Sequence, residues 1–175
     1  MTSPTPRSPV IRVFDCHIAR IAGVSSESRA VDGCYEFLLL RRSASKIYGG
    51  DWRMVGGKIE AGESAWQACL RELAEETGFS PKRLLTVPYL NRFYEWEADR
   101  VNEIPVFVAV VEENTPQLDD EHDGHEWLDI EAACARLAWP GQREGLRAAL
   151  ALLTENEALQ RHLEIPLDSK AHPKG

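Results

Sequence analysis

The chain has 175 residues, of which 43% are hydrophobic and 27% are charged. This profile fits one globular domain and argues against a disordered or fibrous chain. The net charge is −8, and such a surface repels nucleic acids and anionic membranes unless the charge is unevenly placed. It is uneven: residues 112–131 hold nine acids with no Lys or Arg, and residues 57–79 hold five acids with two bases.

The expected elements, in chain order, are a strand (10–22), a loop (25–33), a buried strand (35–41) and a glycine-containing loop (43–51). A short strand (52–55) runs into Gly56-Gly57, and a helix (64–77) follows. Two strands (84–96 and 103–111), a short strand (126–128), a short helix (130–137) and a longer helix (142–163) complete the chain. Strands mixed with helices predict an α/β or α+β sandwich with a mixed sheet.

The ends of the chain and its cysteines indicate the cellular compartment in which we expect the protein. We interpret residues 1–9 as a flexible leader, 10–163 as one domain and 164–175 as a polar tail. The leader lacks an apolar core, so we expect no signal peptide, and the longest apolar run, 104–111, is too short to cross a bilayer. The four cysteines, which lie far apart, are expected to be reduced thiols of a cytoplasmic protein, two or three of them buried: Cys16, Cys34, Cys69 and Cys134.

The helix predicted at 64–77 has clear end signals and an acidic face. Ser64 with Gln67 predicts a capping box, and Gly78 sits where a left-handed residue ends a helix. The three acids Glu72, Glu75 and Glu76 fall within an arc of about 100°. Their repulsion and the helix dipole together cost roughly 1–3 kcal/mol. A divalent cation with oxygen ligands would reverse that sign, although a solvated acidic face is equally compatible with the pattern.

The wider spacing around this helix is more specific. The pattern starts at Gly57 and continues, after five residues, with Glu63 and, after seven more, with Arg71-Glu72-Leu73. One residue then separates this triplet from Glu75-Glu76, and one more precedes Gly78-Phe79. This pattern resembles the Nudix box, the signature of the Nudix hydrolases. The one soft departure is Phe79, where the family usually has an aliphatic residue. The resemblance implies the Nudix α/β/α sandwich over about residues 10 to 160.

The resemblance also implies a divalent cation, Mg²⁺ or Mn²⁺, held on a substrate pyrophosphate. Glu72 and Glu76 match the two main ligands, Glu75 matches a further ligand or base, and the backbone carbonyl of Gly56 matches another ligand. Structural positions of the motif are Gly57, Glu63, Arg71 and Gly78, with Arg71 and Glu63 matching an ion pair that braces the loop. Lys58 sits where some members contact phosphate.

The second acidic run, 112–131, has three interpretations. An EF-hand would need an acid at its twelfth position, which is Ile130, so we reject it. A helical metal pair, His122 with His125, is disfavoured by Gly124, and we expect solvated loop histidines instead. The stretch also resembles the Nudix subgroup that includes dihydroneopterin triphosphate pyrophosphohydrolase, through Glu121-His122, Trp127, Ala132-Ala133, Trp139 and Arg143. In that subgroup the Glu supplies a third carboxylate, so Glu121 is a candidate metal ligand or base.

Other large or charged residues are given their default roles. Trp66, Trp127 and Trp139 are expected in the core. The downstream aromatics Phe93, Tyr94 and Trp96 are expected to fill a core, with base stacking as the alternative. Among the arginines expected to flank the cleft (Arg41, Arg42 and Arg53), we take Arg41 and Arg53, with Lys58, as candidate substrate contacts.

The resemblance therefore implies a Mg²⁺-dependent enzyme that cleaves a (d)NTP or dihydroneopterin triphosphate to a monophosphate and pyrophosphate. The alternatives are a dinucleoside polyphosphate hydrolase of the Ap4A type and a non-catalytic nucleotide-binding module. The expected partner is a small nucleoside polyphosphate, with no nucleic acid and no membrane. The sequence leaves the oligomeric state open between a monomer and a homodimer.

Overall fold

The computed structural model describes residues 9–22, 35–112, 115–155 and 157–167. Its strands are β1 (Val13–Ile21), β2 (Tyr35–Arg42), β3 (Trp52–Arg53), β4 (Val55–Lys58), β5 (Arg83–Glu95), β6 (Arg100–Val110) and β7 (His122–Leu128). Its helices are α1 (Ala65–Thr77), α2 (Ile130–Arg136), α3 (Pro140–Glu155) and α4 (Glu157–Leu163). The expected loop 25–33 and Cys34 lie outside the described residues.

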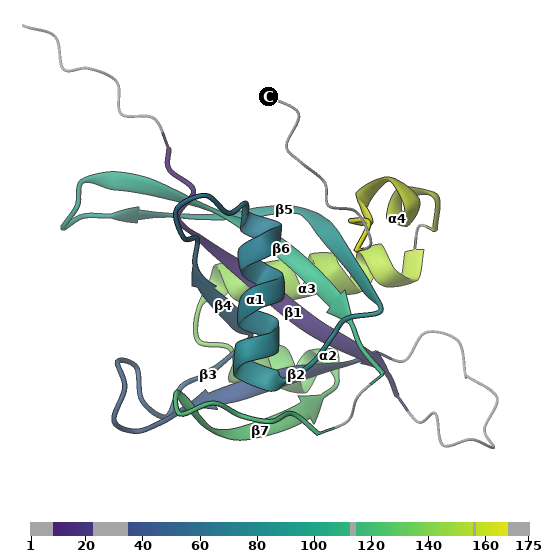
Figure 1. Cartoon of the computed structure of the whole chain (residues 1–175), viewed down its shortest axis with the longest axis horizontal. Helices are drawn as coiled ribbons and strands as arrows, with labels where there is room; N and C mark the ends of the chain where they lie inside the picture. Colours follow the sequence, from purple (N-terminus) through teal and green to yellow (C-terminus); the bar gives the residue numbers. More distant parts are fainter. Residues whose placement is uncertain (1–8, 23–34, 113–114, 156, 168–175) are drawn as a thin grey trace, which may run out of the picture.

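The strands form one mixed sheet in the order β3-β2-β1-β6-β5, with β4 also paired to β1 and β7 to β2. β1 and β6 run parallel, and the other pairs are antiparallel. In Figure 1, α1 lies across one face of the sheet, and α2 and α3 lie behind it. This arrangement confirms the predicted α+β sandwich with a mixed sheet.

Alternation along the strands builds a separate apolar core on each face. Phe14, Cys16 and Ile18 of β1 pack on the α1 face, whereas Ala19 belongs to the core beneath α2 and α3. On β2, Leu38 and Leu40 likewise face α1. Cys16, Cys69 and Cys134 are all buried and free, as predicted.

The ends of α1 follow from the local sequence. The backbone N–H of Ser64 donates to Oε1 of Gln67 at 2.8 Å, which completes the reciprocal half of the predicted capping box. Gly78 adopts a φ of 72°, and its N–H donates to the carbonyl of Ala74 at 2.9 Å. These two ends fix the length of the helix that carries the acidic cluster.

The single helix predicted over 142–163 is wrong, because the structure has two helices, α3 and α4. α3 starts at Pro140, whose fixed φ suits the first helical turn. The amide of Gln160 on α4 donates to the carbonyls of Leu152 and Leu153 at 2.9 and 3.1 Å. This side chain therefore satisfies carbonyls near the end of α3 and ties α4 to α3.

The strand predicted at 126–128 is longer than expected and begins at His122. Residues 122–128 therefore form an extended strand, which excludes an EF-hand loop and corrects the expected loop histidines. β7 pairs along most of β2, with His125 opposite Leu40 and His122 opposite Arg42. This pairing overrides the preference of Gly124 for a loop, because a glycine is tolerated where two strands pair closely.

Two expectations for aromatic residues are wrong. Trp139 is 56% exposed in the connection between α2 and α3, instead of being buried. Phe93, Tyr94 and Trp96 are also exposed, because they lie near the end of the β5–β6 hairpin, which projects beyond the body of the sheet (Figure 1). Trp66 and Trp127, in contrast, are partly buried against the core on the α1 face, as predicted.

No helix in the described part of the chain is long and apolar enough to cross a membrane.

Candidate active site

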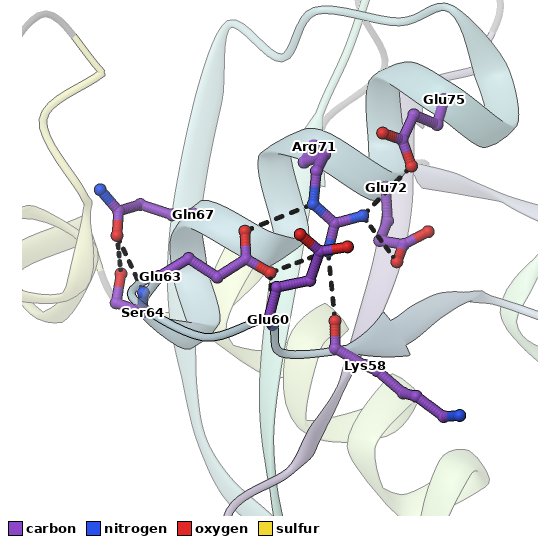
Figure 2. A network of polar contacts seen from close by, with 8 residues as sticks. All are labelled: Lys58, Glu60, Glu63, Ser64, Gln67, Arg71, Glu72 and Glu75. Carbon is purple, nitrogen blue, oxygen red and sulfur yellow. Dashed lines mark hydrogen bonds and ion pairs between the residues drawn. The ribbon is translucent and has the colours of Figure 1, made fainter.

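A single arginine ties the loop before α1 to the acidic side of that helix (Figure 2). Arg71 donates from Nη2 to Glu63 Oε1 at 2.8 Å and to the carbonyl of Lys58 at 3.2 Å. Its Nη1 reaches Glu72 at 2.9 Å and Glu75 at 3.1 Å. The backbone N–H of Glu60 also donates to Glu63, at 2.7 Å. The ion pair implied by the resemblance is therefore present, and it holds the loop in one shape.

This network lowers the pKa of the Glu63 carboxyl, chiefly through the hydrogen bond from Arg71. The carboxylates beside Arg71 raise the pKa of its guanidinium in turn. Both groups therefore remain charged near neutral pH, and the brace is permanently formed.

The three glutamates of α1 have different surroundings. Glu75 is 57% exposed and pairs with Arg71. The side chain of Glu72 is 19% exposed and lies so close to Gly57 that a Cβ atom at position 57 would collide with its carboxylate. Glu76 is only 5% exposed. The three glutamates therefore differ in solvent exposure, and Glu76 is the most buried of them.

Burial raises the pKa of Glu76 to about 8, against the opposing charge of Arg53. Glu72, Asp119 and Glu121 raise it further. Oε2 of Glu76 is buried and has no hydrogen-bond partner among the described residues. The structure therefore brings together the acids of the box with two acids from the second acidic run.

Glu121 reaches this region from the turn before β7, and basic side chains of β2 and its following loop hold it. Its Oε2 accepts from Arg42 Nη1 at 2.5 Å, and Oε1 lies 3.8 Å from Lys46 Nζ. The hydrogen bond from Arg42 lowers the pKa of Glu121. The backbone N–H of Ser43 donates to the carbonyl of Glu121 at 2.8 Å, which fixes the turn against the loop.

Two further residues lie at this site: Asp119, which had no role assigned from the sequence, and His122, which was expected to be a solvated loop histidine. Asp119 Oδ1 accepts from the backbone N–H of Glu121 at 3.1 Å and lies 2.9 Å from Nδ1 of His122. His122 is 4% exposed, and burial lowers its pKa. No spacing rule singles out Asp119, because its contact depends on the turn that precedes β7.

The three basic residues predicted to contact substrate lie in different places. Arg53 is opposite Leu40 on the α1 face, and its charge acts on Glu76. Lys58 is exposed, and its ammonium points away from the carboxylates (Figure 2). Arg41 is not brought to this cluster, because its Nε contacts Asp123 at 2.6 Å and its guanidinium lies 5.9 Å from the Trp52 ring.

The donor set suits a hard divalent cation, which prefers carboxylate and carbonyl oxygens. Within the described ranges, no three acidic, histidine or cysteine side chains are already arranged around a common point. The reason is visible in the ion pairs, since Glu72 and Glu75 face Arg71 while Glu121 faces Arg42. The unpartnered Oε2 of Glu76 is nevertheless what a buried ligand for a cation would present.

Comparison with known proteins agrees with this geometry. A family model described as NUDIX domain matches residues 26–149. An octanoyltransferase from Myxococcus xanthus is 37% identical over 137 residues, which cover 77% of this chain and 36% of that protein. The chain thus spans about a third of the length of this relative.

Two solved structures share the fold. An Ap4A hydrolase binary complex from C. elegans has a TM-score of 0.59 at 24% identity, covering 81% of this chain and 97% of the other. An E. coli dihydroneopterin triphosphate pyrophosphohydrolase has a TM-score of 0.56 at 21% identity, covering 78% and 92%. The chain belongs to the NUDIX family, and its fold is that of Nudix hydrolases.

Proposed function

We propose that this chain is a Mg²⁺-dependent pyrophosphohydrolase, with Mn²⁺ as a substitute, that cleaves a (d)NTP or dihydroneopterin triphosphate to a monophosphate and pyrophosphate. The observation that carries the proposal is Glu76, a buried carboxylate with an unpartnered oxygen among other acids. A fold gains nothing from burying such a group unless a ligand compensates it. Membership of the NUDIX family supports a phosphoanhydride as the bond that is cleaved.

In this proposal, residues from two parts of the chain hold the cation. Those assigned as ligands are Glu72, Glu75, Glu76, Glu121 and the backbone carbonyl of Gly56. The cation neutralises phosphate charge and acidifies a bound water when present. A carboxylate of the chain accepts the proton of the attacking water, and the candidates are Glu75, Glu76 and Glu121.

The surrounding charges support an anionic substrate. Arg53 lies on the face that carries the carboxylates, and Lys58 extends from the braced loop. Both are proposed to contact phosphate. Contact of Arg41 with the substrate stays a prediction, and the ion pair of Arg41 with Asp123 does not favour it. We further propose that residues 10–163 act as one catalytic domain that takes small nucleotides, with neither nucleic acid nor membrane as a partner.

The second candidate is a dinucleoside polyphosphate hydrolase, which the likeness to the C. elegans Ap4A hydrolase fold favours. Product analysis separates the two. We would incubate the chain with Mg²⁺ and ATP, dGTP, dihydroneopterin triphosphate or Ap4A, and identify the products by ion-exchange chromatography. Pyrophosphate from a triphosphate supports the first candidate, and ATP with AMP from Ap4A supports the second.

Two glutamate variants control this assay. Glu76→Gln, which keeps the size of the side chain but removes its charge, should lose at least about 100-fold in rate, since it removes a cation ligand. Glu97→Gln, on the exposed hairpin turn, should match the wild type. Tight nucleotide binding without turnover on any substrate would instead identify a non-catalytic binding module.

A further inference from the structure

Three polar atoms on the α1 face are buried and have no hydrogen-bond partner among the described residues. They are Oε2 of Glu76, Nε of Arg42 and Nε2 of His122. Buried polar atoms normally have partners, so three such atoms in one region need an explanation. The role of His122 is the one that the proposed function leaves open.

The strand register places these side chains on the same face. Leu38 and Leu40 of β2 face α1, and alternation puts Arg42 on that face too. A register shift between Arg41 and Arg42 skips one residue of β7, so that His122 is paired with Arg42, and cross-strand partners lie on one side of a sheet. The charge of Arg53, which acts on Glu76, also acts on His122. His122 therefore belongs to the same site.

Asp119 determines which nitrogen of the His122 imidazole carries the proton. Its Oδ1 lies 2.9 Å from Nδ1 of His122, so the proton resides on Nδ1, and Nε2 becomes a hydrogen-bond acceptor. The same oxygen accepts the backbone N–H of Glu121 at 3.1 Å. One carboxylate thus fixes both the ring of His122 and the backbone of the neighbouring acid.

Because Nε2 of His122 is a hydrogen-bond acceptor, the group that binds to it must be a hydrogen-bond donor. Ionised phosphate oxygens and carboxylates are themselves acceptors, so neither can satisfy Nε2. A water bound to a divalent cation is a strong donor, because the cation increases its acidity. The orphaned N–H of Arg42, in contrast, matches a phosphate oxygen.

We propose that His122 is a positioning residue whose Nε2 accepts a hydrogen bond from a water on the divalent cation, with Asp119 holding the ring in place. This inference rests on the proposed function, since it needs a cation at the carboxylates. It gives the site a hydrogen-bond acceptor that orients the hydrated cation. The competing explanation is structural, with His122 and Arg42 merely filling space beside one another.

The test is histidine NMR on the ¹⁵N-labelled full chain, with Mg²⁺ alone as the probe. Before addition, the two-bond spectrum should show His122 protonated at Nδ1. On addition, the Nε2 signal of His122 should move while that of His162, which is exposed on α4, stays in place. The His122 signal is assigned by its loss in His122→Asn.

Cation affinity gives the second measurement, by Mn²⁺ titration followed with electron paramagnetic resonance. His122→Asn keeps a donor toward Asp119 but lacks the ring acceptor, and should weaken Mn²⁺ binding about 10-fold. His122→Gln, whose Oε1 replaces Nε2 as acceptor, should recover most of this loss. His162→Asn, on the exposed surface of α4, is the control and should bind as the wild type does.

The outcomes separate the two proposals. The positioning role is overturned, while the cation site stands, if the wild type binds Mn²⁺ but two expected results fail. These failures are that the Nε2 signal does not respond to Mg²⁺ and that His122→Asn binds like His162→Asn. If the wild type binds neither cation, the proposed function fails, and this inference fails with it. If His122→Asn does not fold, the wild-type spectra and His122→Gln still decide.

Discussion

The backbone of Gly57 lies directly against the carboxylate of Glu72, so close that a Cβ atom at position 57 would overlap Oε1 and Cδ of that side chain. Gly57→Ala should therefore displace Glu72 from the braced loop and weaken Mn²⁺ binding at least about 10-fold. The backbone of Gly57 lies outside the left-handed region, so the variant should fold. Calorimetric titration with Mn²⁺ measures the effect.

Gly62→Ala is the control for this variant. Gly62 has a φ of 90° with open space around its Cβ position, so the substitution strains the loop without touching Glu72. It should cost about 1 kcal/mol of stability and leave Mn²⁺ affinity nearly unchanged. Equal affinities for Gly57→Ala and Gly62→Ala would show that the contact with Glu72 is unimportant.

The buried Glu76 should make the cation-free protein less stable as the pH rises. Its pKa is about 8 in the folded state and near 4.5 when unfolded, so the folded state binds more protons between these values, and stability falls with rising pH there. From pH 6.5 to 8 the loss should be between about 1 and 2 kcal/mol. Urea unfolding in EDTA at several pH values measures it.

Two other buried groups change the stability only slightly in that window. Burial raises the pKa of Asp15 to about 6, so its effect, of the same sign, is less than about 0.2 kcal/mol above pH 6.5. Burial lowers the pKa of His17 to about 3, so its effect has the opposite sign and still adds about 0.4 kcal/mol of stability above pH 6.5. Glu76→Gln should abolish the fall, and a slope unchanged in that variant would contradict the assignment.

Arg71 should contribute more to stability than an ordinary surface arginine. Lys at this position keeps the charge but lacks the planar guanidinium, so it cannot donate to the carboxylate of Glu63 and the carbonyl of Lys58 with the same geometry. We expect Arg71→Lys to cost about 1–3 kcal/mol by urea unfolding. Arg147→Lys, at an exposed pair with Glu144 on α3, should cost less than about 0.5 kcal/mol. Similar losses in both variants would refute the bracing role.

The tryptophans should differ sharply in their effect on stability. Trp127 is stacked on Phe79 with ring centroids 6.4 Å apart, and the guanidinium of Arg20 lies 4.2 Å from its ring. Trp127→Ala should cost about 3 kcal/mol or more. Trp139 is 56% exposed, so Trp139→Ala should cost less than about 1 kcal/mol. Thermal unfolding compares them, and a larger loss for Trp139→Ala would contradict the exposure.

Much of the fold could be predicted because its signals are local. The ends of α1 depend on Ser64, Gln67 and Gly78, which are all within a few residues of the helix. The division of the predicted helix into α3 and α4 could not be predicted in this way. It involves Gln160 reaching back to carbonyls of α3, a contact that no periodic pattern encodes.

The aromatic errors have a similar cause. A strand pattern does not reveal whether another layer covers it, and the end of the β5–β6 hairpin extends past the sheet (Figure 1). Phe93 and Tyr94 are therefore exposed despite a sequence typical of a buried strand. The length of β7 was underestimated because its pairing with β2 is a tertiary interaction.

The sequence by itself determined the acidic box, its brace and the family, because the spacing of these residues within one loop and helix carries that information. Only the tertiary structure decided which acid is buried and which other groups surround it. The pairing of β7 with β2 accompanies the ion pair of Glu121 with Arg42, and the packing of distant segments leaves Glu76 only 5% exposed. Burial and electrostatic coupling arise between segments far apart in the chain, and spacing along one segment cannot specify them.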